Sequence, residues 1–456
     1  MKVLKFGGTS VGTVNSLNNV KKIVESIPEK AIIVVSALGG LTDKLISTAK
    51  LAATGDASWL TEMEAIRQRH YDIIDNVVPE SKREIIRERI EKQLTGLQRN
   101  YEGVALLRSL PEKTLDIIVS FGERMSSIIV AEMVKNGKRY FSPDFIKTEK
   151  WYGKNIVDRK LTDRLIHETF DNLEENEKAI VPGFISTDST SGEITNLGRG
   201  GSDYTGALLA SALNADVLEI WTDVDGFMTA DPRIVKDAII IDHLSFTESM
   251  ELCTFGAKVI YPPTIYPVFH GNIPIKILNT FNPEAPGTLI NEAPIENDLD
   301  IKGVTSLKGI SLFTINLKES DVVEDVTRRT YNTLIRKAVR IIPLQNEETS
   351  KSLNFAIAST QTDIFIDSLK KEFAPELSNE IIENITILEN VAAVAMVGKD
   401  MKQKSRLLPR ISNSLSRAGI KVLAVSPSTS VTTLVVIIPE SQISEALPLI
   451  HSLIFT

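Results

Sequence analysis

Glycines and an arginine at positions 198–203 form the segment of the chain best suited to chemistry. The run Gly198-Arg199-Gly200-Gly201-Ser202-Asp203 stands just before ALLASALNA, an apolar stretch that predicts a helix. Glycine backbone lets N–H groups approach an anion, and the helix dipole adds about half a positive charge there. Arg199 offers a planar fork for a carboxylate or phosphate, and Ser202 and Asp203 are typical N-cap residues. The run predicts an anion site; a capped glycine-rich turn is the alternative.

A second glycine pair near the N-terminus has a similar setting. A buried strand is predicted over 2–6, followed by Gly7-Gly8-Thr9-Ser10 and a helix over about 13–26. This strand–glycine–helix order is typical of a phosphate cradle, although it is neither a Walker A nor a G-x-G-x-x-G sequence. Lys5 lies two residues before the glycines, where its charge can reach the same anion. A solvated lysine at a strand end is the alternative for Lys5.

Further polar residues follow other predicted strands. The apolar run 31–37 indicates a buried parallel strand, and it brings Ser36 and Thr42 to the strand's end. A strand is predicted at 117–120, which puts Glu123 at a strand-to-helix junction; a helix N-terminal acid favoured by the dipole is its alternative. A strand at 217–223 is followed by a turn at 224–226, and a polar hairpin is predicted between 183 and 198. Ligands bind where parallel strands end, so we expect Ser36 and Thr42 to lie at the ligand-binding edge of the sheet.

The remaining elements indicate more than one domain. Residues 56–118 have helical period and high charge, and we interpret them as a helical insertion with a solvated face. Proline, asparagine and acidic residues near 290–300 indicate a domain boundary. Beyond it, the order strand, helix, strand, strand, helix occurs twice, which predicts two small α+β units.

Composition excludes several classes of protein. The net charge of -8 and pI near 5.4 argue against nucleic acid as a partner. Cys253 is the single cysteine, so no internal disulfide is possible. The N-terminus has no signal-peptide pattern, and the longest apolar run, 31–38, is too short to span a membrane. We therefore expect a cytoplasmic protein that does not bind membranes.

Taken in order, these segments resemble the motif series of the aspartate kinase family along nearly the whole chain. The matching segments are Lys5-Phe6-Gly7-Gly8-Thr9-Ser10, Ser36…Thr42-Asp43, Gly122-Glu123, 198–203, Trp221-Thr222-Asp223-Val224-Asp225-Gly226, Thr229…Asp231-Pro232-Arg233 and Gly256-Ala257-Lys258-Val259. The resemblance implies a three-layer α/β amino-acid-kinase domain with a mainly parallel sheet over 1–292, including the insertion 56–118. Two intertwined ACT domains would follow over 301–456, at about 309–380 and 385–456, with the strand near 301–308 a candidate to join the second.

The resemblance also implies a reaction, in which ATP phosphorylates the β-carboxylate of L-aspartate. That carboxylate is ionised at neutral pH and needs no general base, so catalysis is expected to be positioning and charge neutralisation, with Mg²⁺ bridging the ATP phosphates. Lys5 and Asp203 would be catalytic; Asp203 would either orient Lys5 or help bind metal through water. The resemblance assigns aspartate to Ser36, Thr42, Glu123, Arg199 and Gly200. It assigns ATP to Gly7, Gly8, Ser202, Trp221, Thr222, Asp223, Met228, Arg233 and Lys258, with the Gly7 and Gly8 amides at the phosphates.

Regulation and assembly are further implications of the resemblance. The family commonly has tyrosine where this chain has Met228, which offers no hydroxyl to the nucleotide. An amino-acid effector, threonine or lysine, would bind near Gln345, Asn346, Thr429 and Ser430, although the family's effector motif is altered at 427–431. A homodimer or tetramer would form through the ACT domains. The insertion and the C-terminal segment most resemble the kinase half of bifunctional aspartokinase–homoserine dehydrogenases, and we expect no dehydrogenase in this chain.

Two alternatives stay open at this point. One is another amino-acid kinase of the same fold, for glutamate or acetylglutamate, against which the paired C-terminal units and the 198–206 segment count. The other is a non-catalytic amino-acid sensor, against which the presence of Lys5, Arg199 and Asp203 counts. A substrate panel separates the first, and a failure to release ADP with any amino acid would favour the second.

Overall fold

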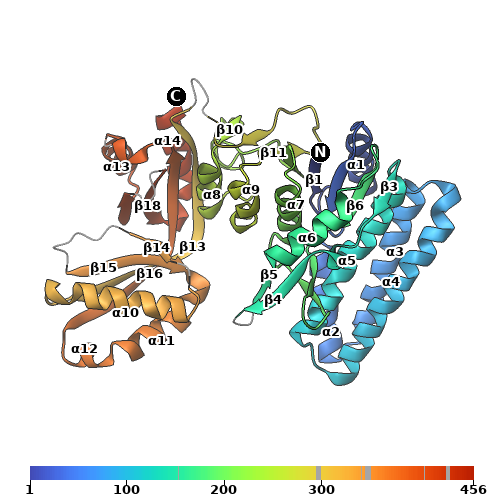
Figure 1. The fold of residues 1–456 in the computed structure, drawn as a ribbon. Helices are drawn as coiled ribbons and strands as arrows, with labels where there is room; N and C mark the ends of the chain where they lie inside the picture. The colour runs from blue at the N-terminus through green and yellow to red at the C-terminus, as the bar shows by residue number, and fades with distance from the viewer. Residues whose placement is uncertain are drawn as a thin grey trace. The chain divides into compact units, whose positions relative to one another are not determined.

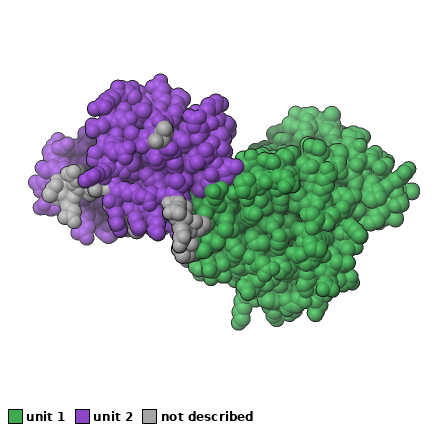
Figure 2. Space-filling view, turned by 90° about the horizontal axis from the view of Figure 1, so that it is seen from above, with its two compact units in different colours: residues 1–227, 242–246, 259–293 green, residues 228–241, 247–258, 294–456 purple. Residues whose placement is uncertain are grey.

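The chain divides into two compact units. The computed structural model describes residues 1–151, 154–293, 299–339, 341–344, 351–404, 406–427 and 432–455. Unit 1 comprises residues 1–227, 242–246 and 259–293, and unit 2 comprises 228–241, 247–258 and 294–456 (Figure 2).

An eight-stranded sheet forms the centre of unit 1 (Figure 1). Its strands lie in the order β10-β12-β11-β9-β1-β2-β6-β3, and all neighbours are parallel except β11 and β12. The strands are β1 (Lys2–Phe6), β2 (Ala31–Val35), β3 (Gly137–Arg139), β6 (Lys178–Pro182), β9 (Val217–Thr222), β10 (His243–Leu244), β11 (Ile275–Asn279) and β12 (Thr288–Ile290).

Helices cover both faces of this sheet because its central strands are apolar on both sides. Leu4 and Phe6 of β1 join a core with helices α1 to α5, whereas Lys5 points to the opposite face, against α7. This arrangement confirms the predicted three-layer α/β fold. The helices of unit 1 are α1 (Val14–Glu25), α2 (Leu41–Thr54), α3 (Ser58–Val77), α4 (Glu80–Leu107), α5 (Glu112–Met133), α6 (Arg159–Phe170), α7 (Gly201–Ala212) and α9 (Tyr266–His270), with short 3-10 helices η1 (Ser142–Asp144) and η2 (Pro262–Thr264).

The predicted strand at 117–120 is wrong, because these residues lie inside helix α5. Glu123 is therefore a mid-helix residue and not the first residue after a strand. The run Ile117-Ile118-Val119 is continuously apolar because this part of α5 packs between the sheet and the other helices, and Ile118, Val119 and Ser120 are all buried. A short apolar run of this kind cannot be told from a buried strand by its period.

A small second sheet in unit 1 leads into the glycine-rich segment. It has the order β5-β4-β7-β8. Strands β7 (Ile185–Asp188) and β8 (Ile194–Asn196) form the predicted hairpin, which delivers the chain to Gly198; the other strands are β4 (Lys147–Trp151) and β5 (Lys154–Val157).

Unit 2 is built on one six-stranded sheet shared by the two C-terminal repeats, in the order β14-β15-β13-β16-β18-β17. The long strands β13 and β16 pair antiparallel, and the stretch 301–307 of β13 pairs with 393–398 of the second repeat. The strands are β13 (Ile301–Leu317), β14 (Ile341–Pro343), β15 (Ser352–Ala358), β16 (Ile382–Gly398), β17 (Ala424–Pro427) and β18 (Thr433–Pro439). The helices are α8 (Phe246–Thr254), α10 (Val323–Arg336), α11 (Thr362–Glu372), α12 (Ala374–Ser378), α13 (Leu407–Arg417) and α14 (Ile443–Phe455), with η3 (Ser320–Val322), η4 (Ser359–Gln361), η5 (Met401–Gln403) and η6 (Glu440–Gln442).

Two segments from the predicted 1–292 domain belong to unit 2. Residues 228–241 and 247–258 pack with the C-terminal repeats, and Ala230 and Val235 join the core formed by α13, α14 and β18. The order of the elements along the chain does not predict that these two segments pack with the C-terminal repeats. The predicted effector residues Gln345, Asn346, Thr429 and Ser430 lie outside the described residues. Over the described part of the chain, no helix is long and apolar enough to cross a bilayer.

Candidate active site

A cavity of about 260 Å³ in unit 1 collects most of the residues predicted to bind aspartate or to catalyse transfer. It lies where β1, β2 and β6 end and α7 begins. Its lining consists of Lys5, Ser36, Thr42, Glu123, Phe184, Gly198, Arg199, Gly200, Gly201, Ser202 and Asp203. All five residues expected to contact aspartate, together with Lys5, Ser202 and Asp203, therefore line one cavity.

An ion pair joins the two residues predicted to be catalytic. Lys5 Nζ lies 2.6 Å from Asp203 Oδ1, and the two side chains are 11% and 13% exposed. Lys5 comes from β1 and Asp203 from the first turn of α7, so the sheet and the helix together fix the ammonium. This geometry favours the orienting role for Asp203 over a role in binding metal through water.

The N-terminus of α7 is built differently from the prediction. Gly200 is the N-cap, with φ of 70°, and no side chain caps the helix. Ser202 and Asp203 were expected as N-cap residues, and this is wrong: both lie in the first turn. Left-handed backbone at Gly200 places the helix start earlier, because glycine adopts a positive φ at little cost. The Asp203 carboxylate is therefore free to pair with Lys5.

Glu123 reaches the cavity because α5 approaches the chain after β2 very closely. A Cβ at Gly122 would lie 2.7 Å from Ala37 Cβ, so only glycine allows this approach. Glu123 is 4% exposed, and its Oε2 has no hydrogen-bond partner in the described structure. Burial raises the pKa of Glu123 to about 8, opposed by hydrogen bonding from the Ala37 amide and by the charge of Lys5. A bound ammonium group would satisfy the free oxygen and favour the carboxylate form.

Arg199 supplies a positive group at the same cavity. Its guanidinium lies 5.7 Å from the ring centre of Tyr261, and the side chain is exposed. A cavity with Arg199 in its lining and buried Glu123 can accept a ligand that carries both a carboxylate and an ammonium group.

Two glycine segments of unit 1, Gly7–Gly12 after β1 and Gly39-Gly40 after β2, pack backbone against backbone. A Cβ at Gly39 would lie 3.0 Å from the carbonyl oxygen of Gly8, which allows little room for a side chain. The Gly7 N–H donates to the carbonyl of Trp221 at 3.1 Å. The Gly7 amide is therefore already hydrogen-bonded in this structure, because β1 continues its pairing with β9 past Phe6, and phosphate binding by the Gly7 and Gly8 amides stays a prediction. Neither Gly7 nor Gly8 lines the cavity.

The residues predicted to bind ATP are not brought together within one unit. Trp221, Thr222 and Asp223 lie at the end of β9 in unit 1, where the indole is buried against Phe6 and donates to Glu219 at 3.0 Å. The Trp221 side chain thus belongs to the core. Met228, Arg233 and Lys258 belong to unit 2, where Arg233 forms an ion pair with Asp231 at 2.7 Å.

Two further residues, Phe184 and Arg69, were not identified from the sequence. Phe184 lines the cavity with φ of 68°, which is unusual for a bulky residue, and its N–H donates to Thr205. Arg69, on α3 of the helical insertion, donates to the carbonyls of Gly12 and Gly39 at 3.0 and 2.8 Å. Arg69 therefore ties the insertion to both glycine segments. The sequence carries no signal for either role, since one depends on a backbone angle and the other on a long-range contact.

Metal binding by the protein alone has little support in the described residues, where no group of three or more His, Cys, Asp or Glu side chains could hold an ion. Magnesium, however, usually binds through substrate phosphates with one or two carboxylates and water. Asp203, at the start of α7, would be the candidate for such a single carboxylate ligand, but it already forms an ion pair with Lys5.

Comparison with known proteins gives consistent matches along the chain. The amino acid kinase family model matches residues 1–279, and an ACT domain model matches 394–453. The chain is 29% identical over its whole length to a bifunctional aspartokinase/homoserine dehydrogenase of Haemophilus influenzae, of which it covers 56%. It is 30% identical to the lysine-sensitive aspartokinase 3 of Escherichia coli, covering 99% of both chains. The chain thus spans about half the length of the bifunctional relatives it matches.

Solved structures agree with these matches. Escherichia coli aspartokinase III in complex with aspartate and ADP aligns with a TM-score of 0.84 at 26% identity, covering 100% of each chain. The aspartate kinase of Clostridium acetobutylicum aligns with a TM-score of 0.82 at 27% identity, again over 100% of both chains.

Proposed function

The chain belongs to the amino acid kinase family and, within it, to the aspartokinases, and we propose that it transfers the γ-phosphoryl group of ATP to the β-carboxylate of L-aspartate. The observation that carries this proposal is the cavity shared by Lys5, Glu123 and Arg199. Such a cavity suits a small zwitterion next to a fixed ammonium group. A coupled assay of ADP release with aspartate, glutamate and acetylglutamate tests the proposal, and activity with aspartate alone is expected.

The mechanism needs positioning and charge neutralisation, and no general base. The attacking β-carboxylate of aspartate is already ionised at neutral pH. In our proposal, Lys5, held by Asp203, stabilises the charge that develops on the transferred phosphoryl group, and the N-terminus of α7 adds its dipole. Mg²⁺ bound with ATP would neutralise further charge, while Asp203 would serve mainly to orient Lys5.

Substrate recognition follows from the two charged groups of the cavity. In our proposal, Glu123 accepts the α-ammonium group of aspartate, Arg199 pairs with a carboxylate, and Ser36, Thr42 and the Gly200 backbone donate or accept hydrogen bonds. ATP contacts by Trp221 to Asp223, Met228, Arg233 and Lys258, feedback by lysine or threonine, and a cytoplasmic location remain predictions. One related structure has lysine and aspartate bound, which supports an amino-acid effector.

We expect Arg199→Lys to raise the KM for aspartate by about tenfold with little change in ATP affinity. Lysine keeps the charge but loses the planar fork, so a bidentate carboxylate contact weakens. Titration calorimetry with aspartate and with a non-hydrolysable ATP analogue measures both affinities. Arg164→Lys, an exposed arginine on α6 outside the cavity, is the control. A larger loss for the nucleotide than for aspartate would reverse our assignment of Arg199.

We also expect the full chain to form a dimer or tetramer through unit 2. Two-fold pairing covers exposed sheet edges and apolar helix faces, and closed symmetry is the commonest way to do so. On α10 and α11, Ile335 and Ile364 are 75% and 63% exposed, and both lie in the first repeat. Light scattering on the full chain gives the mass directly, and Ile335→Glu should lower it. A chain that is monomeric at micromolar concentration would contradict this expectation.

A further inference from the structure

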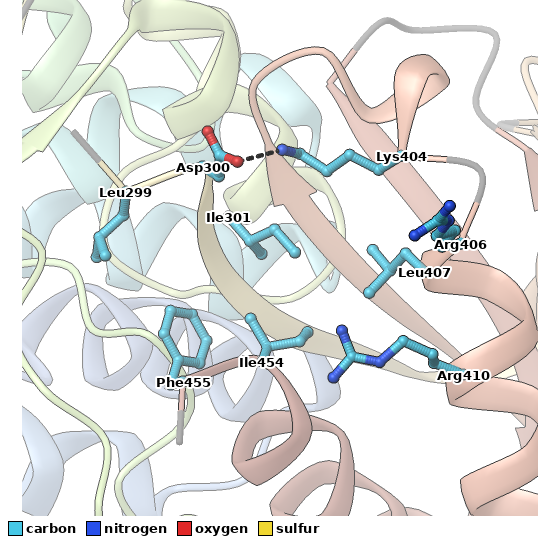
Figure 3. A pocket seen from close by; sticks show the side chains of 9 residues that line it. All are labelled: Leu299, Asp300, Ile301, Lys404, Arg406, Leu407, Arg410, Ile454 and Phe455. Atoms are coloured by element: carbon cyan, nitrogen blue, oxygen red, sulfur yellow. Dashed lines mark hydrogen bonds and ion pairs between the residues drawn. The ribbon is translucent and has the colours of Figure 1, made fainter. Parts of the chain in front are cut away.

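A second and larger cavity, of about 430 Å³, lies in unit 2, and its lining includes none of the residues assigned above (Figure 3). It is bounded by the start of β13, the N-terminus of α13 and the C-terminal end of α14. Its apolar lining consists of Leu299, Ile301, Leu407, Ile454 and Phe455, and its charged lining consists of Asp300, Lys404, Arg406 and Arg410.

The charges around this cavity are unbalanced. Lys404 pairs with Asp300 at 2.7 Å, which leaves Arg406 and Arg410 without a carboxylate partner among the described residues. Among the residues that the structure describes, Arg410 donates one long hydrogen bond, of 3.4 Å, to the carbonyl of Leu453. The lining therefore has two positive charges in excess, next to an aliphatic and aromatic wall.

The position of the two arginines opposes the usual charge preference of a helix. Arg406 is the N-cap of α13 and Arg410 lies one turn further on, while the first turn contains no acidic residue. Positive groups at a helix N-terminus are unfavourable because the dipole is also positive there. This violation of a local rule, combined with a cavity of ligand size, indicates a function and not a device for stability.

We propose that this cavity binds a small organic anion with an apolar body, and that the occupant influences the nucleotide segment 228–241. The anionic group would lie between Arg406, Arg410 and the α13 N-terminus, and the apolar part against Leu407, Ile454 and Phe455. A carboxylate and a phosphate ester share this chemistry.

The influence on segment 228–241 follows from the elements that form the cavity. Helix α14 carries His451 one turn before Phe455, and His451 Nε2 is 2.9 Å from the buried Thr229 Oγ1. Strand β13 carries Val304, whose N–H donates to the Thr229 carbonyl at 2.7 Å. The same Thr229 also exchanges two hydrogen bonds with Ile239, of 2.9 and 3.0 Å. Thr229 therefore joins both cavity walls to the segment that carries Met228 and Arg233.

Binding is tested on the full chain by titration calorimetry with four probes. These are 4-methyl-2-oxopentanoate, isopentyl phosphate, the neutral 3-methylbutanol and inorganic phosphate. We expect one or both organic anions to bind, and the better of the two identifies the anionic group. The double variant Arg406→Gln, Arg410→Gln should weaken that binding at least fivefold. Arg417→Gln, at the far end of α13, should leave it unchanged. Equal binding by the double variant, equal binding of inorganic phosphate or the alcohol, or no binding of either organic anion would overturn the site.

Coupling is tested by amide hydrogen exchange, which does not depend on catalysis. The bound probe should change exchange in 228–241 at least threefold, and His451→Leu should abolish this change while leaving probe affinity within twofold. Ile443→Ala, at the start of α14 and in the same core, controls for loosened packing. An unchanged exchange rate in the wild type, or a response that survives His451→Leu, would overturn the coupling.

A kinetic consequence rests on the proposed function. If the chain is an aspartate kinase that uses Arg233 for ATP, the probe should change the KM for ATP at least threefold and leave the KM for aspartate within twofold. A wild-type chain without ADP release would refute the kinase activity alone, since calorimetry and exchange would still decide the site. If the enzyme is active but its KM for ATP is the same with and without the bound probe, the influence on nucleotide binding is refuted.

Discussion

Lys5→Ala is expected to lower kcat by about a hundredfold or more, while the KM for aspartate changes little. Lys5 Nζ is fixed by Asp203 at 2.6 Å, in a cavity where both side chains are nearly excluded from solvent. Removing one comparable preorganised donor from an active site raises the activation free energy by about 2.7–4 kcal/mol. Because the interaction forms mainly in the transition state, as charge develops, its loss should lower kcat and leave the KM nearly unchanged.

Steady-state kinetics with saturating ATP measure this effect. Lys2→Ala is the matched control, since Lys2 lies on the same strand, pairs with Glu219 at 3.2 Å and does not line the cavity. Its kcat should stay within twofold of the wild type. Asp203→Asn should lower kcat less than Lys5→Ala does, because the Lys5 ammonium group remains but is less well oriented. An unchanged kcat for Lys5→Ala, with a folded protein by circular dichroism, would remove Lys5 from the mechanism.

The sequence predicts the candidate site best where residues suited to chemistry lie at the end of a strand or at the start of a helix. The end of a parallel strand and the start of a helix are indicated by local patterns, so Lys5 could be assigned to a strand end, Ser36 to a sheet edge and Arg199 to a helix start from the sequence. The structure brings these three into one cavity. Patterns of this kind predict a site well because the fold places all strand ends at one edge.

Other features depend on contacts that local patterns do not encode. Helix α5 resembles a strand at 117–120 because this stretch is a short apolar run in which Ile118, Val119 and Ser120 are all buried. The left-handed backbone of Phe184 and the reach of Arg69 to Gly12 and Gly39 depend on long-range packing. The packing of 228–241 in unit 2 depends on contacts distant in sequence, such as Ala230 and Val235 with the core of the second repeat and Thr229 with His451, 222 positions apart.

Glu123→Gln is expected to raise the KM for aspartate by about a hundredfold and to flatten its pH dependence. Burial raises the pKa of Glu123 to about 8, so the empty site holds a mostly neutral carboxyl at pH 7. An α-ammonium group favours the carboxylate, so binding of aspartate releases a proton below pH 8. The KM of the wild type should therefore fall as pH rises from 6.5 to 8, by at most about tenfold per pH unit, and then level.

The same pKa fixes the sign of the effect on stability. A carboxyl whose folded pKa lies above its unfolded value of 4.5 stabilises the fold fully only below pH 4.5, and this contribution is lost as pH rises to about 8. Glutamine carries no charge at any pH, so Glu123→Gln should gain thermal stability relative to the wild type between pH 5 and 8. Glu112→Gln, an exposed residue on the same helix and outside the cavity, is the control for both measurements. If the KM of Glu123→Gln follows the wild-type pH profile in parallel, the proton belongs to another group and Glu123 does not receive the ammonium of aspartate.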